Sequence, residues 1–387
     1  MLCPWTLCVL SVALADDSSS DEPVEDTLEL RVEQLEQELL TLQAALEAEQ
    51  KAALLREAEA LAAQAPPPPP PRTTARNSFN PGITAFGDVL GSVGFGPEGV
   101  DPASTLWLRS LELDIRAAVD PRATAVAVLA VEQEPPLSIG PNPEEDEEDE
   151  EGGHSAFSAS PEEVYVDFVG LPAGLNLRAG QSRQPFGVSN RMHPHDLPWS
   201  GSPMPLVNTL GHEGYADVGL NASMLLPLPV ALTLSGGVLS GRPLDEDARI
   251  GWLGRAEGFA HAGRWDLGVG ASAVGTDSGM AVWGSDLMLR WRASSWRSVV
   301  LLAEVVSDEQ LGGYAALQVQ PARTLYLGLR ADQYGQDRLY GGYASWYSSE
   351  FLRLRVGLLT DGESTLADAQ LTFVWGAHPV EPYWVNR

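Results

Sequence analysis

The chain has 387 residues and carries 53 Asp and Glu against 24 Lys and Arg, which gives a formal net charge of −29. Hydrophobic residues make up 44% of the chain, a share that excludes a wholly disordered protein. Lys occurs only at Lys51, and no basic cluster could neutralise nucleic-acid phosphates. The composition therefore excludes nucleic acid as a partner.

The acidic residues are concentrated in two regions. Residues 16–64 contain 14 acidic and 3 basic residues, a net charge of −11, and Glu144–Glu151 is an unbroken run of eight carboxylates. Together these regions supply −19 of the −29, so the rest of the chain is only mildly acidic. Runs of like charge are usually solvated and disordered, and we expect this of residues 144–151.

The first fifteen residues predict a signal peptide for export. They form a short apolar stretch that ends in Ala-Leu-Ala at residues 13–15, a small-residue cleavage pattern. The stretch is too short to cross a membrane as a helix. Cys3 and Cys8, the only cysteines, lie within it, so the exported chain would hold no disulfide and no thiolate metal site. The alternative is a buried N-terminal helix.

Residues 16–64 predict an acidic helical segment with a narrow apolar seam. The seam residues alternate steps of four and three along the chain: Leu28, Val32, Leu35, Leu39, Leu42 and Leu46. Such a seam needs a partner helix, so we expect a coiled coil that joins subunits. The alternative is an amphipathic helix that rests on its own chain. Six prolines at residues 66–71 then form a stiff spacer within a linker at 65–80.

Residues 81–387 predict an all-β domain, because polar and apolar residues alternate with a period of two. The number of strands is even, and most approach the roughly ten residues that a tilted membrane strand needs. The sixteen expected strands are 82–96, 106–119, 122–134, 163–170, 174–181, 213–226, 229–239, 250–261, 263–274, 281–293, 296–307, 311–320, 322–334, 338–348, 350–360 and 366–377.

Two further features distinguish a membrane barrel from a soluble sandwich, which also alternates. The expected connections are alternately short and long, and 135–162 and 182–212 are the longest. Aromatic residues gather at both strand ends, as in the girdles of membrane barrels. One girdle comprises Trp107, Trp252, Trp283 and Tyr340, and the other Trp265, Trp291, Trp296, Tyr326, Trp346, Phe351 and Trp375. We therefore expect a transmembrane antiparallel β-barrel of about 16 strands in outer-membrane lipid, with the N-terminal coiled coil in the periplasm.

A barrel of sixteen strands encloses a lumen too wide for side chains to fill. The polar faces of the strands would line it with both signs of charge, and no ladder of one sign appears. We expect most of these charges to brace the wall as ion pairs. The candidates are Glu112, Asp114, Arg116, Asp167, Arg178, Asp217, Arg290, Arg330, Asp332, Arg353 and Arg355.

The loop 182–212 is the candidate for a segment that folds into the lumen and narrows it. Its candidate constriction residues are Arg183, Arg191, His193, His195 and Asp196. His193, His195 and Asp196, together with His212, are also suitable zinc ligands. The alternative is that they cap the loop and hydrogen-bond to the wall. No nucleotide-binding, hydrolase or metalloprotease motif is present, so we expect no enzyme activity and no cofactor apart from this candidate zinc ion.

Three segments resemble those of a known group of proteins: residues 77–83, 171–181 and 190–199. Over residues 77–377 the chain resembles the phosphate-selective porins, and more closely the barrels labelled zinc-regulated, TonB-dependent outer-membrane receptors. The resemblance implies a sixteen-strand barrel with a periplasmic coiled coil, often assembled as a trimer. The barrel contains no Lys, which argues against phosphate selectivity, and residues 16–76 hold no plug domain of the kind that a TonB-dependent receptor needs.

The sequence therefore predicts a porin for passive diffusion of small hydrophilic solutes or ions. The acidic run 144–151 falls in a long loop, where it would gather cations at the channel mouth and give a weak cation preference. One alternative is a zinc-uptake barrel that uses His193, His195, Asp196 and His212. Another is an envelope tether, in which the coiled coil contacts the cell wall or other subunits and the barrel is only an anchor.

Overall fold

The computed structural model describes residues 81–133 apart from 98, 102 and 103, residues 157–376, and nine positions between 35 and 49. The chain divides into two compact units, Met1–Thr74 and Ala75–Arg387. The nine positions of the first unit are helical and exposed, which agrees with the helix expected there. The expected signal peptide, the other positions of the expected coiled coil, the proline linker and the acidic run 144–151 lie outside the described residues. None of the helices described is long and apolar enough to cross a membrane.

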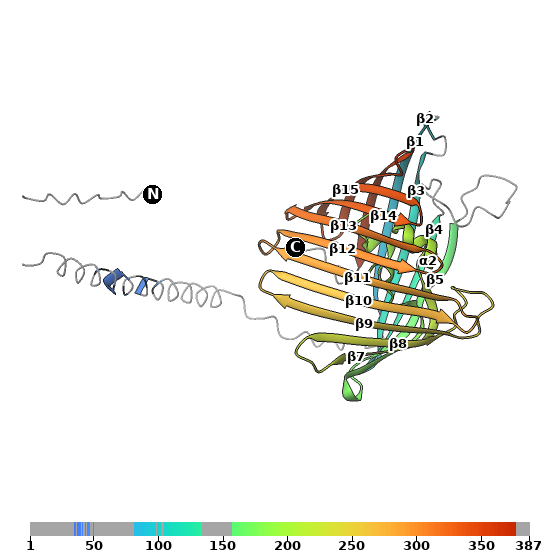
Figure 1. Ribbon diagram of the computed structural model, residues 1–387, viewed down its shortest axis with the longest axis horizontal. Coiled ribbons are helices and arrows are strands. Elements are labelled where there is room, and N and C mark those ends of the chain that lie inside the picture. The colour runs from blue at the N-terminus through green and yellow to red at the C-terminus, as the bar shows by residue number, and fades with distance from the viewer. Residues whose placement is uncertain are drawn as a thin grey trace, which may run out of the picture. The chain divides into compact units, whose positions relative to one another are not determined.

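Sixteen long antiparallel strands of the described residues form one closed barrel (Figure 1). Each pairs with its neighbours in the chain, and β1 closes the sheet by pairing with both β3 and β17. The strands are β1 (Gly82–Gly96), β3 (Thr105–Asp120), β4 (Ala123–Gln133), β5 (Phe157–Phe168), β6 (Leu175–Arg183), β7 (Ala216–Leu226), β8 (Ala231–Leu239), β9 (Gly251–Ala262), β10 (Trp265–Thr276), β11 (Ala281–Arg292), β12 (Ser298–Ser307), β13 (Leu311–Ala322), β14 (Leu325–Tyr334), β15 (Asp337–Ser349), β16 (Leu352–Thr360) and β17 (Thr365–Gly376).

The smaller elements lie in the connections. A two-residue strand, β2 (Gly99–Val100), pairs with the end of β1. The segment between β6 and β7 contains the 3-10 turns η2 (Ser189–Arg191) and η3 (Pro194–Asp196) and the helix α2 (Met204–Leu210), while η1 (Pro172–Gly174) lies in a turn between β5 and β6. Prolines open both η3 and α2, where a missing N–H costs no helical hydrogen bond.

Every strand expected from the sequence is present, and β5 differs most in its limits. It begins at Phe157 instead of residue 163, because a bulge accommodates Pro161 within the strand. Leu129 on β4 pairs with Pro161 and Val128 pairs with Glu163, so Glu162 is the extra residue of the bulge. A bulge interrupts the alternation of faces and redirects a side chain. Glu162 and Glu163 are consequently both buried.

The outer face of the barrel is apolar, as a lipid-facing surface requires. Leu220, Leu267, Leu329 and Val356 are among its exposed side chains. Seven of the expected girdle aromatics are also exposed: Trp252, Trp283 and Tyr340 in one girdle, and Trp265, Trp346, Phe351 and Trp375 in the other.

The assignment of Trp107 and Tyr326 to the girdles was wrong, because both side chains are buried. Trp107 pairs with Leu90, whose side chain is also buried. Tyr326 lies an even number of residues from Arg330 on the same strand, so the two share a face. Both aromatic residues therefore face the barrel interior.

The expected strict alternation of short and long connections was also wrong in the second half of the barrel. One edge has only tight turns, as expected: 121–122, 169–174, 227–230, 263–264, 293–297, 323–324 and 350–351. The other edge has longer connections at 97–104, 134–156, 184–215 and 240–250, but short ones at 277–280, 308–310, 335–336 and 361–364. Antiparallel neighbours need only a two-residue turn, so barrel closure does not require a long loop on either edge.

Candidate functional site

Residues 184–215, hereafter the inner segment, pack inside the barrel. Phe186, Trp199 and Leu206 of the segment are buried, and α2 contacts β12, β13 and β14. The segment shares one apolar core with side chains of the wall. This core comprises Phe186, Val188, Leu197, Trp199, Leu206, Leu210 and Tyr215 of the segment, and Leu239, Leu253, Val274, Val282, Met288, Val300, Leu302, Val306, Tyr314, Ala316 and Tyr343 of the strands.

The wall beneath the inner segment is apolar on both faces. On β12, Val300, Leu302 and Val306 are buried against the segment, while Val305 on the other face is exposed. Strands covered on both faces read as continuous apolar runs instead of alternating ones. The run Ser298–Ser307, SVVLLAEVVS, has this character. It is the sequence signal that could have located the covered part of the wall.

Two glycines of the wall leave room for the inner segment. A Cβ atom on Gly284 of β11 would lie 2.6 Å from Cζ of Phe186, and one on Gly312 of β13 would lie 2.7 Å from Cβ of Pro205. Both distances are far below a van der Waals contact. Side chains at these two positions would therefore displace the segment.

The variant Gly284→Leu is expected to expose the inner segment to protease. The new side chain collides with Phe186 and removes it from the core, so trypsin should cleave after Arg191 in the folded, detergent-solubilised barrel. Gly254→Leu is the matched control, because a Cβ atom there meets nothing within 4 Å. If both variants were equally resistant to trypsin, the packing of Phe186 against β11 would be contradicted.

Arginines of the wall hold the backbone of the inner segment. Four of them, from β3, β14 and β16, donate to carbonyl groups within residues 195–201. Arg353 donates to the His195 carbonyl at 2.5 Å, Arg355 to Leu197 at 2.6 Å and Arg330 to Gly201 at 2.8 Å, while Arg109 donates to Ser200. Buried carbonyl groups outside regular secondary structure need such partners. Arg330, Arg353 and Arg355 thus lie on the interior face, as expected, but are buried under the segment.

Carboxylates of the wall satisfy the backbone N–H groups of the same segment. Glu304 accepts hydrogen bonds from the N–H groups of Val188 at 3.1 Å and Ser189 at 2.8 Å, and from the Tyr314 hydroxyl at 2.6 Å. Asp332 accepts from the N–H of Met204 at 3.0 Å, at the start of α2. These charged side chains therefore supply the backbone of the inner segment with the hydrogen bonds that a neighbouring strand would otherwise provide.

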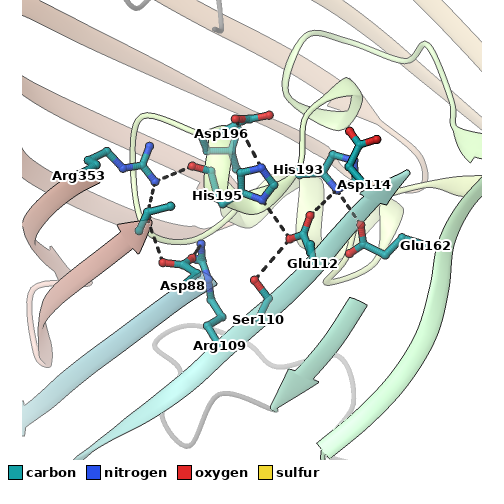
Figure 2. A network of polar contacts seen from close by, with 12 residues as sticks. Asp88, Arg109, Ser110, Glu112, Asp114, Glu162, His193, His195, Asp196 and Arg353 are labelled. Carbon is teal, nitrogen blue, oxygen red and sulfur yellow. Dashed lines mark hydrogen bonds and ion pairs between the residues drawn. The ribbon is translucent and has the colours of Figure 1, made fainter. Parts of the chain in front are cut away.

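His193 and His195 lie on the inner segment above β3 and β5 (Figure 2). Their rings stack, with centroids 5.6 Å apart and planes inclined by 16°. The Nδ1 atom of His195 lies 3.0 Å from Oε1 of Glu112. The Nδ1 atom of His193 lies 2.6 Å from Oε2 of Glu162 and 3.4 Å from Oε2 of Glu112. The two imidazoles therefore meet two buried carboxylates.

The charge state of these imidazoles is set by opposing influences. Burial is the largest single influence and lowers the pKa of both histidines. The Glu112 carboxylate outweighs it only together with other carboxylates, which are Glu162 at His193 and Asp196 and Asp88 at His195. The pKa of His195 is raised to about 9, and that of His193 is raised as well. With no other cation present, the His195 ring is expected to carry a proton at neutral pH and to attach the segment to the wall.

The other residues proposed for a constriction or a zinc site lie at the end of β6 (Arg183) and along the inner segment. Arg183 is buried and donates to the Glu213 carbonyl at 2.5 Å, and Arg191 pairs with Glu257 at 2.9 Å. Asp196 lies 3.6 Å from Nε2 of His195. His212 is exposed. Among the described residues, the one group suited to a metal ion joins His193 to Glu112 and Glu162, and it includes neither Asp196 nor His212.

Glu162 is the member of this group that the sequence reasoning missed. Regular alternation cannot place Glu162 and Glu163 on one face, and the strand was expected to begin at Glu163, after Glu162. Pro161 was the available signal, since proline within a strand is typical of a bulge.

The remaining residues expected to line the lumen form ion pairs with their neighbours. Asp114 pairs with Arg116 at 2.7 Å, Asp167 with Arg178 at 2.7 Å, and Asp266 with Arg290 at 2.8 Å. Asp217 accepts hydrogen bonds from the Tyr215 hydroxyl at 2.9 Å and the Gly241 N–H at 2.8 Å. These contacts match the expected bracing of the wall by paired charges.

Comparison with known proteins identifies the fold and leaves the family open. No protein-family model matches the chain. An uncharacterized protein of Aquifex aeolicus is 36% identical over 80 residues, which cover 21% of this chain and only 17% of that relative. Among solved structures, OprB of Pseudomonas putida has a TM-score of 0.51 at 10% identity, covering 76% of this chain and 94% of that one. OmpF of Salmonella typhi, solved with daunomycin, has a TM-score of 0.50 at 8% identity and covers 77% and 99%.

The fold is that of an outer-membrane porin. At such low identity the likeness extends to the barrel and not to any binding site. The inner segment of this chain must accordingly be understood from its own contacts.

Proposed function

We propose that this protein is an outer-membrane channel through which small hydrophilic solutes or ions diffuse passively. The observation that carries the proposal is the inner segment, which lies within a closed barrel and is bound to its inner wall. Its contacts reach β3 and β5 through the histidines, β9 through Arg191, β12 through Glu304 and β16 through Arg353. The segment therefore sets the free cross-section of the lumen.

The proposed path is lined by charged residues that are partly exposed on the interior face. Arg116, Arg178 and Arg191 and the acids Asp167 and Glu257 have this character. Both signs are present and paired, and the described residues contain no ladder of one sign that would impose strong selectivity. The acidic run 144–151, which falls between β4 and β5, favours cations at that mouth.

The mature protein is expected to give discrete open steps in a planar bilayer, with a reversal potential of the cation-selective sign under a potassium chloride gradient. Both readings follow from an aqueous lumen of mixed charge and an acidic mouth. Replacing the eight acids at 144–151 by Gln should move the reversal potential toward zero. A silent but correctly folded barrel would refute the channel, and an anion-selective sign would refute the cation preference.

The proposal includes the N-terminal region as an assembly element. The resemblance to trimeric barrels and the apolar seam at 28–46 favour a homotrimer joined by a periplasmic coiled coil. Deleting residues 16–72 should change the oligomeric state and leave the conductance of each barrel intact. An envelope tether would instead require those residues for its effect in the cell.

A further inference from the structure

Three metal-ligand atoms from three separate elements converge inside the barrel. Glu112 on β3, Glu162 on β5 and His193 on the inner segment each offer one ligand atom, and these atoms lie within 4.8 Å of one another (Figure 2). Nδ1 of His193 faces Oε2 of Glu112 and Oε2 of Glu162. Ligand atoms around a tetrahedral zinc ion, bound at about 2.0–2.1 Å, are separated by about 3.3 Å. The separation of 3.4 Å between Nδ1 of His193 and Oε2 of Glu112 matches that spacing. The 2.6 Å between Nδ1 of His193 and Oε2 of Glu162 is a direct contact, which an ion would widen by about 0.7 Å.

In Glu112 and in Glu162, one carboxylate oxygen lies near another residue of the protein and the other faces His193. Oε1 of Glu112 lies 3.0 Å from His195 and accepts from the Ser110 hydroxyl at 3.4 Å. Oε1 of Glu162 lies 3.8 Å from the Arg183 guanidinium. Outer partners of this kind orient the ligands of metal sites. The geometry thus leaves the two Oε2 atoms directed at His193.

The facing atoms of Glu162 and His193 have no hydrogen-bond partner among the described residues. Glu162 is 8% exposed, and its Oε2 atom is fully buried. It lies 2.6 Å from Nδ1 of His193, which allows an ion pair with a protonated imidazole, although the angles are not those of a hydrogen bond. A neutral imidazole would leave this buried oxygen without a partner, which is costly. A cation between these atoms would satisfy both.

The surroundings carry more negative than positive charge. The bulge in β5 turns Glu162 toward the group beside Glu163, which accepts from the N–H of Arg183 at 2.8 Å. Two further acids, Glu132 and Glu213, lie near Glu162, and their carboxyl groups contact each other. Glu132 and Glu213 share one proton, because their carboxyl groups hydrogen-bond to each other, so four negative charges face the Arg183 guanidinium and the two imidazoles. A divalent cation would reduce this imbalance.

We propose that Glu112, Glu162 and His193 bind a divalent transition-metal ion of the zinc class, with a solvent molecule as the remaining ligand. One imidazole and two carboxylates are a ligand set that zinc accepts. Because the ligands come from β3, β5 and the inner segment, the ion fastens the segment to the wall. The role is structural and does not depend on the proposed channel activity. A proton on His193 would serve the same carboxylates when no metal is bound.

The test is a calorimetric titration of the folded full-length mature protein with zinc chloride at neutral pH. We expect one equivalent of zinc per chain, and an affinity at least about tenfold lower in Glu162→Gln, which keeps the shape of the side chain. His212→Gln and His261→Gln are matched controls, because neither residue belongs to the group, and both should bind as the parent protein does. Zinc should also raise the unfolding temperature of the parent protein but not that of Glu162→Gln.

Three outcomes would overturn the proposal. They are no zinc binding by a correctly folded parent protein, equal affinity in Glu162→Gln, and loss of binding in His212→Gln alone, which would place the ion on the surface. Bilayer recordings in the presence of a chelator test the channel separately. Open steps without zinc binding would leave the channel intact and remove only the metal site.

Discussion

Replacing the inner segment, residues 184–215, by an Asn-Gly turn is expected to raise the single-channel conductance severalfold. Arg183 and Ala216 are direct partners in the register of β6 and β7, so a two-residue hairpin turn can join the strands at that point. The replacement removes the side chains that fill the interior above β11, β12 and β13. Water then occupies a lumen that sixteen strands hold open.

The barrel itself should survive this replacement, because its closure does not involve the inner segment. β1 and β17 pair along their length, from Thr84 with Gly376 to Phe95 with Thr365. Arginines and carboxylates released from the segment become hydrated, while Val300 and Leu302 become exposed to water at a cost in stability. Heat-modifiable migration on gels confirms folding before the conductance is recorded.

The loop 240–250 provides the matched control for this experiment. Leu239 and Gly251 are direct register partners on β8 and β9, so the same turn can replace that loop as well. The conductance of this second variant should stay close to that of the parent protein. Equal conductance of all three proteins would show that the inner segment does not limit the path.

The course of the strands could be predicted because alternation is a local property of the sequence. All sixteen strands are present, and residues such as Asp332 and Arg355 lie on the face that alternation gave them. Errors arose where the local pattern is ambiguous. Tyr326 is an aromatic residue near a strand end, as girdle residues are, but its side chain lies on the interior face. Pro161 interrupts the alternating pattern, so the first part of β5 was not predicted.

The candidate site could be predicted only in part, because its two halves are far apart in the sequence. His193 and His195 were assigned to one loop from their spacing, and both lie on the inner segment. Their partners Glu112 and Glu162 are set by the register of β3 and β5 and by a bulge, which a single sequence does not reveal. The same applies to Arg353, which meets the carbonyl group of His195 at a separation of 158 residues.

The charged residues inside the barrel chiefly stabilise the protein's own structure. A channel wall of both signs was expected to brace the strands or to select ions. Arg330, Arg353 and Glu304 instead bind the backbone of the inner segment, whose irregular course leaves N–H and carbonyl groups without ladder partners. The same residues could contact permeating ions only if the segment were displaced.

The variant Arg355→Met is expected to lower the stability of the folded barrel by about 1–3 kcal/mol, the range for a buried hydrogen-bonding group that loses its partner. Arg355 donates to the Leu197 carbonyl at 2.6 Å, to Oε1 of Gln370 at 2.7 Å and to the Ser345 hydroxyl at 3.1 Å. Methionine keeps much of the buried volume but leaves these three acceptors without a donor. The free energy of unfolding in guanidinium, measured in detergent, gives the effect.

Arg116→Met is the matched control, because it removes the same charge from the same interior face. The Arg116 side chain is 59% exposed and pairs only with Asp114 among the hydrogen-bonded contacts described. Exposed pairs of this kind contribute about 0–1 kcal/mol. Hydrogen exchange at residues 195–201 should increase in Arg355→Met and remain unchanged in Arg116→Met. If both variants lost a similar amount of stability, the arginines would stabilise the barrel through their charge in the interior and not by attaching the inner segment to the wall.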